Sequence, residues 1–200
     1  MNQFHIFGFK VFRLDRNRFG GGLILYINEN IPCRPLNDHP TFPNLELIAI
    51  EIHQNKRRWL FIGMYKPPSQ SDRKFKNRLS SIIDYYSPKY ENLILIGDCN
   101  LSIENQHLDA LIQAYNLNNL INKPTCFQSN TPTCIDLILT NKKDLFKLSN
   151  TFETGISDHH KLVSTILKSG SFKGTPKIKI YRSYKNFELE NFDKIGRAHV

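Results

Sequence analysis

Apolar residues along the chain fall mostly into short runs, some of them alternating with polar positions, and this pattern predicts more strands than helices. Several runs end at Pro, Gly or Asn, which interrupt strands. The predicted strands cover residues 9–13, 23–27, 45–52, 59–65, 93–96, 134–140, 150–153 and 162–167. The runs 45–52 and 59–65 are separated by a short polar turn and are expected to form a hairpin.

Two segments show apolar residues at helical spacing instead. Residues 75–86 carry one apolar stripe and a basic opposite face, and 107–115 form a second, shorter amphipathic segment. Because strands outnumber helices and several are joined as hairpins, the sheets are expected to be mixed or antiparallel. Two sheets packed face to face with helices outside would fit this order, so the predicted class is an α/β sandwich.

The size and composition suit one soluble domain. The chain has 200 residues, of which 40% are hydrophobic and 22% charged. No apolar run approaches the roughly 20 residues that a membrane span needs, and the N-terminus lacks a signal-peptide pattern, so we expect an intracellular protein with no membrane partner. We place the folded domain at 1–167 and a Ser-, Gly- and Lys-rich basic linker at 168–194. Residues 195–200 resemble a translated sequencing adapter, so we expect them to have no functional role.

Charge and cysteine content narrow the function only a little. The formal net charge of +9 favours polyanionic partners, since Lys and Arg that neutralise phosphates release counterions. The four cysteines show no Cys-x-x-Cys spacing. A zinc site or a disulfide framework is therefore not indicated, and free thiols are expected.

The most informative stretch is 93–100, where four apolar residues end in Gly97 and are followed by Asp98 and Asn100. A loop at the carboxyl end of a buried strand is a common place for catalytic side chains. In an extended loop Asp98 and Asn100 would point to the same side, where a carboxylate and an amide could activate and orient a water. The alternative is an ordinary Asx turn that closes the strand.

Further polar groups stand at the ends of other predicted strands. Asp136 lies inside an apolar strand and needs a partner, because an unpaired buried carboxylate is costly. Asp158 and His159 lie in a polar loop just before the last strand, and a carboxylate that orients an imidazole is a recurrent device in acid–base chemistry. The hydroxyl groups of Tyr65, Thr125 and Thr133 could donate to phosphate oxygens. Each residue alone would be assigned to a cap, a turn or the core; their concentration at strand ends favours a hydrolytic site.

Motifs in this order resemble the endonuclease/exonuclease/phosphatase superfamily (DNase I-like). They are Tyr-Lys-Pro-Pro at 65–68, Ile-Gly-Asp-Cys-Asn at 96–100, Cys-Ile-Asp-Leu-Ile-Leu-Thr-Asn at 134–141 and Ser-Asp-His at 157–159. The segments 18–27, 122–127 and 157–160 are similar, more narrowly, to the apurinic-type endonuclease domain of non-LTR retrotransposon (jockey-like) reverse transcriptase polyproteins. The resemblance extends over roughly residues 4–167.

This resemblance implies a fold, an activity and partners. The fold would be a four-layer α/β sandwich of two mixed β-sheets flanked by helices. The activity would be hydrolysis of phosphodiesters or phosphomonoesters with Mg²⁺ (or Mn²⁺). In the retrotransposon branch the domain nicks target DNA and so primes reverse transcription. DNA would be the partner, together with the reverse-transcriptase domain of the same polyprotein, and the protein would act in the nucleus and cytoplasm.

The resemblance also implies a role for each matched site residue. Asp98 would activate the attacking water, and Asn100 would orient water or phosphate. His159 would contact the scissile phosphate while Asp136 holds its imidazole. Asp158 would help to place the metal, and Tyr65 would hydrogen-bond the phosphate.

The match is incomplete at its start. Family members begin with a strand ending in an Asn motif, followed by a strand with a Glu motif that supplies a principal metal ligand. This sequence begins just after that point, and Glu46 and Glu51 lie in the wrong strand to replace the ligand. We therefore expect the first strands to be missing and this chain to show no Mg²⁺-dependent nicking. The alternatives are an inert retrotransposon remnant with weak DNA binding and a small-molecule phosphatase.

Overall fold

The computed structural model describes residues 4–17, 21–42, 45–128, 130–153, 155 and 160–168. The chain divides into two compact units, Met1–Ser169 and Gly170–Val200. The second unit lies outside the described residues, as do nearly all of the predicted linker and the whole predicted adapter segment.

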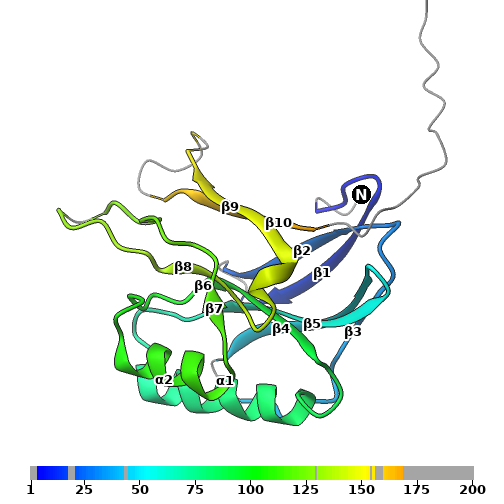
Figure 1. The fold of residues 1–200 in the computed structure, drawn as a ribbon, viewed down its shortest axis with the longest axis horizontal. Coiled ribbons are helices and arrows are strands. Elements are labelled where there is room, and N and C mark those ends of the chain that lie inside the picture. Colours follow the sequence, from blue (N-terminus) through cyan, green and yellow to red (C-terminus); the bar gives the residue numbers. More distant parts are fainter. Residues whose placement is uncertain are drawn as a thin grey trace, which may run out of the picture. The chain divides into compact units, whose positions relative to one another are not determined.

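A six-stranded mixed sheet forms the centre of the first unit (Figure 1). Its spatial order is β3-β4-β5-β6-β8-β7. Only β5 and β6 run parallel, and α1 connects them; the other neighbours are antiparallel. The strands are β3 (Cys33–Pro35), β4 (Glu46–Gln54), β5 (Arg57–Tyr65), β6 (Asn92–Asp98), β7 (Asn118–Asn119) and β8 (Asp136–Thr140).

Both α-helices cover one face of this sheet, α1 (Asp72–Tyr86) and α2 (Gln106–Ala114) (Figure 1). Alternate strand residues point toward them, as the period of two requires. In β5 these are Leu60, Ile62 and Met64, which join the core cluster together with Phe75 and Leu79 of α1. All five side chains are at most 1% exposed, so the predicted apolar stripe of residues 75–86 is confirmed.

Two antiparallel two-stranded ribbons lie on the opposite side of the sheet (Figure 1). They are β1 (Phe9–Asp15) with β2 (Gly22–Asn28), and β9 (Phe146–Phe152) with β10 (Leu162–Leu167). Gly63 of β5 leaves room for Leu25 of β2, since a Cβ there would meet the leucine methyl groups at 3.3 Å. A 3-10 turn, η1 (Lys143–Leu145), leads into β9.

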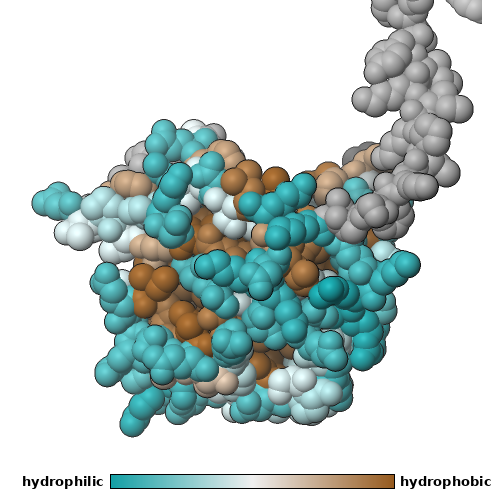
Figure 2. Space-filling model, in the orientation of Figure 1, coloured by the Kyte–Doolittle hydropathy of each residue, from teal (hydrophilic) through white to brown (hydrophobic). Residues whose placement is uncertain are grey.

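The α/β fold class is confirmed, but the predicted second sheet takes the form of two separate ribbons in the described part of the chain. No described helix covers their outer side (Figure 1). Apolar side chains on these ribbons are accordingly exposed, among them Leu148 at 56% and Leu162 at 54%. Figure 2 shows apolar surface over the ribbons among the hydrophilic residues of this face.

The predicted strands and helices are present, with differences at their ends. β9 begins at Phe146, four residues before the predicted strand at 150, because Phe146, Leu148 and Ser149 also pair with β10. The short strands β3 and β7 were not predicted. All four cysteines are free thiols, as expected. No helix among the described residues is long and apolar enough to cross a bilayer.

Candidate active site

A row of polar residues crosses four neighbouring strands at one end of the six-stranded sheet. Glu46 pairs with Tyr65, Tyr65 pairs with Asp98, and Asp98 pairs with Asp136. Residues directly opposite each other in a sheet project from the same face. Leu47, Met64 and Leu137 neighbour this row in sequence and belong to the helix-side core, so the row faces the ribbons.

Gly97 allows β5 and β6 to pair as far as Asp98. A Cβ at Gly97 would lie 1.7 Å from the carbonyl oxygen of Met64, and its φ is +152°. Only glycine fits so close a backbone approach. The sequence predicted that the strand ends before Gly97, but the pairing continues by two residues and carries Asp98 into the sheet.

Asp98 and Asp136 form a pair of facing carboxylates. The pKa of Asp98 is raised, first by burial and then by the negative charge of Asp136, against the opposing effects of the Asn100 N–H, His160 and Lys66. Asp136 Oδ2 is buried and accepts no hydrogen bond from the described residues. His160 Nδ1 lies 3.8 Å from this oxygen, which is beyond hydrogen-bond distance. A cation or a donor at this position would stabilise both carboxylates.

The prediction that Asp98 and Asn100 point to the same side of an extended loop was wrong. Asn100 has a φ of +45°, and its backbone N–H donates to Asp98 Oδ1 at 2.9 Å. This is the Asx turn that was the alternative prediction. The side-chain amide donates to the Lys66 carbonyl at 2.9 Å, so the turn fixes Asn100 at the same end of the sheet as Asp98.

Thr125 supports Asp136 from the loop before β8. Thr125 is completely buried, and its Oγ1 accepts the backbone N–H groups of Ile135 at 3.2 Å and Asp136 at 3.1 Å. These bonds give Thr125 a positioning role rather than the predicted phosphate contact. Thr133 forms a two-way backbone bridge with Cys126 and is only partly buried. Its side chain stays a candidate for phosphate contact.

The predicted Asp158 and His159 lie outside the described residues. The imidazole that the structure places beside Asp136 belongs to the next residue, His160. His160 forms a β-bridge with Cys126, and its Nε2 lies 3.8 Å from the Cys126 thiol. The His-His pair in the sequence was the available signal for it, but only its first member matched the family motif.

Two cations beside the row were missed by sequence reasoning. The Arg16 guanidinium lies 4.9 Å from the Tyr65 ring centroid and donates twice to Glu46, at 2.5 and 3.1 Å. Lys66 is 1% exposed, and its ammonium lies 3.0 Å from Asp72 Oδ1. Neither the basic loop at Arg16 nor the sequence around Lys66 has a local pattern that predicts these ion pairs.

A cavity of about 780 Å³ lies next to this end of the sheet. Its wall includes Glu46 from the row, its partner Arg16, and Lys74 and Arg78 from α1. The basic side chains of α1, expected to form a solvated face, therefore contribute in part to a hollow near the candidate site. A hollow with this charge suits an anionic ligand such as a phosphate backbone.

The described residues fit a divalent metal only in part. Asp98 and Asp136 supply the hard oxygen donors that Mg²⁺ and Mn²⁺ prefer, and Asp136 Oδ2, which accepts no hydrogen bond from the described residues, could bind a cation. Within the described residues, however, no three His, Cys, Asp or Glu side chains converge to hold a metal ion. The two carboxylates would therefore hold a metal together with further oxygen ligands, such as those of water or substrate.

Comparisons with known proteins agree with this arrangement. The family model described as "endonuclease-reverse transcriptase" matches residues 59–163, which include Tyr65, Asp98, Asn100 and Asp136. No curated protein sequence matches the chain significantly.

Several solved structures share the fold. The endonuclease domain of TRAS1, a telomere-specific non-LTR retrotransposon, has a TM-score of 0.64 and 17% identity, and the match covers 80% of this chain and 79% of that one. The human Nocturnin catalytic domain has a TM-score of 0.56 and 16% identity, and the match covers 80% of this chain and 73% of that one. The 3′ phosphatase NExo from Neisseria has a TM-score of 0.50 and 14% identity, and the match covers 80% of each chain. The family-model match and the shared fold agree that the chain belongs to the endonuclease-reverse transcriptase family of the endonuclease/exonuclease/phosphatase superfamily.

Proposed function

We propose that this domain hydrolyses a phosphodiester bond in DNA with Mg²⁺ or Mn²⁺, nicking target DNA so that reverse transcription can be primed. The observation that supports this most is the facing pair Asp98 and Asp136, in register at the end of the sheet. Burial and mutual repulsion make two ionised carboxylates unfavourable there unless a cation joins them. When bound, the metal would supply Lewis-acid stabilisation of charge on the phosphate oxygens.

Three residues of the chain would then prepare the attack on phosphorus. Asp98, whose pKa is raised, is the better proton acceptor for a water held at this end of the sheet. Asn100, fixed by the Lys66 carbonyl, would orient that water or a phosphate oxygen. Tyr65, held under the Arg16 guanidinium, would donate its hydroxyl to the phosphate.

The remaining roles fall on the second carboxylate and the imidazoles. Asp136, held by Thr125, would orient an imidazole that stabilises charge on the scissile phosphate. By the family motif this is His159, with Asp158 as the metal carboxylate. His160, at 3.8 Å from Asp136, is the described alternative.

We also propose that metal binding is weak in this chain. Asp98 and Asp136 face each other, but within the described residues no third His, Cys, Asp or Glu side chain converges on them. A Mg²⁺ site with few protein oxygens retains most of its waters and depends on substrate phosphates for affinity. We therefore expect no nicking of supercoiled plasmid with Mg²⁺, and slow nicking only at high Mn²⁺.

The test compares the wild-type chain with Asp98→Asn, Asp136→Asn and the control Asp109→Asn. Asp109 is exposed on α2 and bonds only Gln113. Nicking with Mn²⁺ should disappear in both site variants and persist in the control. As a readout that needs no turnover, Mn²⁺ should broaden NMR signals of the residues around Asp98 and Asp136 in the wild type, and less so in Asp136→Asn.

Other outcomes would overturn one or both of these proposals. Robust Mg²⁺-dependent nicking that His159→Ala abolishes would support the nuclease and overturn the proposed weak metal binding. Hydrolysis of small phosphomonoesters without DNA cleavage would indicate a phosphatase. Salt-sensitive DNA binding with no cleavage under any metal condition would indicate the inert remnant.

A further inference from the structure

A concentration of positive charge lies at the end of the sheet opposite the candidate active site. The first part is the tight turn between β4 and β5, with Lys56, Arg57 and Arg58, all exposed. The turn is firmly built: Asn55 and Lys56 have φ values of +54° and +60°, as in a two-residue hairpin turn. The turn therefore fixes the backbone from which these three side chains project.

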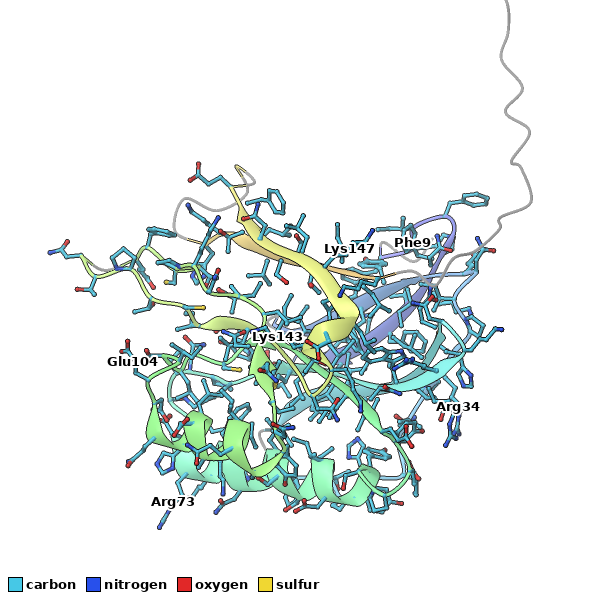
Figure 3. The ribbon with its side chains drawn as sticks, in the orientation of Figure 1. Phe9, Arg34, Arg73, Glu104, Lys143 and Lys147 are labelled. Atoms are coloured by element: carbon cyan, nitrogen blue, oxygen red, sulfur yellow. The ribbon has the colours of Figure 1, made fainter. Side chains whose placement is uncertain are left out.

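The second part comes from the connection between β8 and β9. It supplies Lys142, Lys143 and Lys147, and Lys143 and Lys147 are exposed. Figure 3 shows Lys143 and Lys147 on the same face of the molecule, with Glu104, which follows the candidate active site, well to one side. We call these six residues, Lys56, Arg57, Arg58, Lys142, Lys143 and Lys147, the basic belt.

Hydrogen bonds hold the two parts of the belt together. Asn55 donates to the Lys168 carbonyl at 2.8 Å, and Lys168 Nζ donates to the Asp144 carbonyl at 2.7 Å. On the other side, Asn141 donates to the Glu91 carbonyl at 2.9 Å. The turn and the connection are thus one continuous surface, although they are more than 80 residues apart in sequence.

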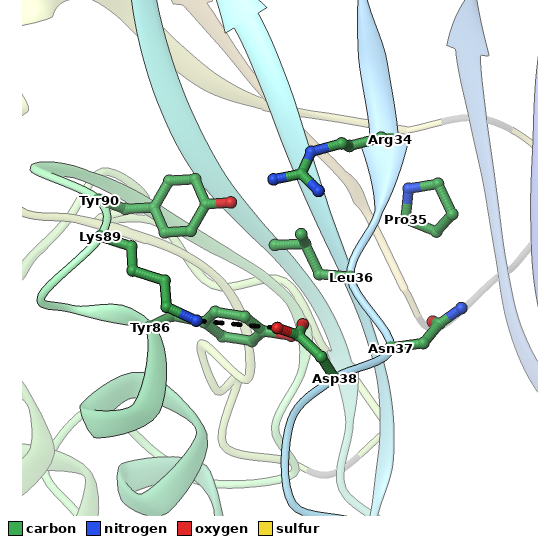
Figure 4. A pocket seen from close by; sticks show the side chains of 8 residues that line it. All are labelled: Arg34, Pro35, Leu36, Asn37, Asp38, Tyr86, Lys89 and Tyr90. Atoms are coloured by element: carbon green, nitrogen blue, oxygen red, sulfur yellow. Dashed lines mark hydrogen bonds and ion pairs between the residues drawn. The ribbon is translucent and has the colours of Figure 1, made fainter.

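The belt charges are not neutralised by the described part of the protein. No belt side chain forms an ion pair with a described residue, whereas other cations nearby do. Lys89 lies 3.7 Å from Asp38 (Figure 4), and Arg34 lies 3.0 Å from Glu51. The cavity of about 470 Å³ between these pairs is therefore not a comparable cationic site. The belt segments 55–58 and 142–147 together carry six cations and one carboxylate, Asp144.

Such a surface fits a phosphate backbone, and the surrounding side chains favour duplex over single-stranded nucleic acid. Single strands are bound through exposed aromatic rings on which bases stack. Here Trp59 is 2% exposed and Tyr90 is 7% exposed, and Phe146 packs against Trp59 with centroids 6.0 Å apart. Phosphate contacts alone, without a stacking platform, give sequence-independent binding of a duplex.

The belt and the candidate active site lie at opposite ends of the strands. Strand β6 runs from Asn92, near the belt, to Asp98 in the site. Seven residues at about 3.3 Å each separate the two by roughly 20 Å. A duplex that lies across the strand ends at the site, rather than along the strands, would have to bend to reach the belt, and such bending is costly over short lengths.

We propose that the basic belt is a second binding surface for duplex DNA, which holds a segment other than the one at the candidate active site. The proposal rests on DNA being the substrate. It does not depend on catalysis, because the belt lies apart from the residues assigned to hydrolysis. A domain with both surfaces could hold two DNA segments at once.

The test is DNA binding in EDTA, where no cleavage can occur, with two belt variants and a matched control. Lys56→Gln/Arg57→Gln and Lys143→Gln/Lys147→Gln each remove two belt charges. Arg73→Gln/Lys76→Gln removes two charges from α1, on the side of the sheet where Figure 3 shows Arg73. Binding of a short duplex is measured over a salt series, and bridging is measured by energy transfer between two differently labelled duplexes.

Each belt variant should reduce the slope of the logarithm of the binding constant against the logarithm of salt concentration by about one unit per removed cation. Each should also abolish bridging. The control should change neither quantity. Because the binding is measured in EDTA, this result does not depend on whether the domain cleaves DNA. Belt variants that behave like the control would overturn the proposal. A preference for single-stranded over duplex DNA would overturn it as well.

Discussion

Replacing Gly97 by Ala should strongly destabilise the domain. The new Cβ would lie 1.7 Å from the Met64 carbonyl oxygen and 2.8 Å from the Met64 carbonyl carbon. Both are backbone atoms of the paired strand, so no side-chain rotation can relieve the clash. β5 and β6 would have to move apart at the point where Asp98 enters the sheet.

The magnitude follows from three contributions. The positive φ costs an L-residue about 1–2 kcal/mol, overpacking about 1–3 kcal/mol, and a lost ladder hydrogen bond about 1 kcal/mol. The expected loss is therefore about 3–6 kcal/mol. This is a large part of the roughly 5–15 kcal/mol that stabilises a typical domain.

Urea unfolding followed by tryptophan fluorescence measures this directly, because Trp59 is the single tryptophan and lies in β5. Gly155→Ala is the matched control. Gly155 also has a positive φ, +68°, but its added Cβ would meet no atom within 4 Å. Gly155→Ala should thus lose only the conformational contribution. If Gly97→Ala is no less stable than Gly155→Ala, the close backbone approach does not constrain this strand pair.

Two further predictions concern buried charges. Glu51, 4% exposed, has a pKa lowered from 4.5 to about 2, first by the Arg34 hydrogen bond, against burial, and then by Tyr90 and His53. Because folding lowers this pKa, the ionised Glu51 carboxylate stabilises the folded protein above about pH 4.5. That stabilisation is lost as the pH falls from about 4.5 through 2. In urea unfolding, the free energy of unfolding of the wild type should exceed that of Glu51→Gln by at most about 3 kcal/mol at neutral pH. This difference should disappear by pH 2. A difference that does not change with pH would contradict the prediction. For the Lys66–Asp72 pair, Asp72→Asn should cost about 3 kcal/mol by leaving the buried ammonium unpaired, and adding Lys66→Met should recover much of that loss. Additive losses in this double-mutant cycle would show that the two groups are not coupled.

Much of the fold was predictable from local patterns. The apolar run at 59–65 located β5, and the helical spacing in 75–86 located α1, because burial of one helix face imposes a period on the sequence. β3 and β7 were not predictable, since three and two residues are too few to show a period. The early start of β9 was missed for a different reason: Phe146, Leu148 and Ser149 pair with β10 across a register shift, and this pairing depends on a strand that comes later in the sequence.

The candidate site, like the fold, was predictable only in part. Asp98 and Asp136 were identified from their place at the ends of apolar runs, and the structure brings them opposite each other. The turn at Asn100 and the positioning role of Thr125 depend on the Lys66 carbonyl and the N–H groups of Ile135 and Asp136. Such partners are fixed only when strands distant in sequence are brought together.

The sequence by itself determined the type of each main element, the family, and the residue types that carry the proposed chemistry. These depend on local periodicity and on short motifs, which a linear chain displays directly. Only the tertiary structure decided that Glu46, Tyr65, Asp98 and Asp136 form one row, that Arg16 and Lys66 stand beside it, and that the basic belt unites two distant segments. Strand register and side-chain partners are set by non-local packing, because a shift of one residue would turn every side chain to the other face.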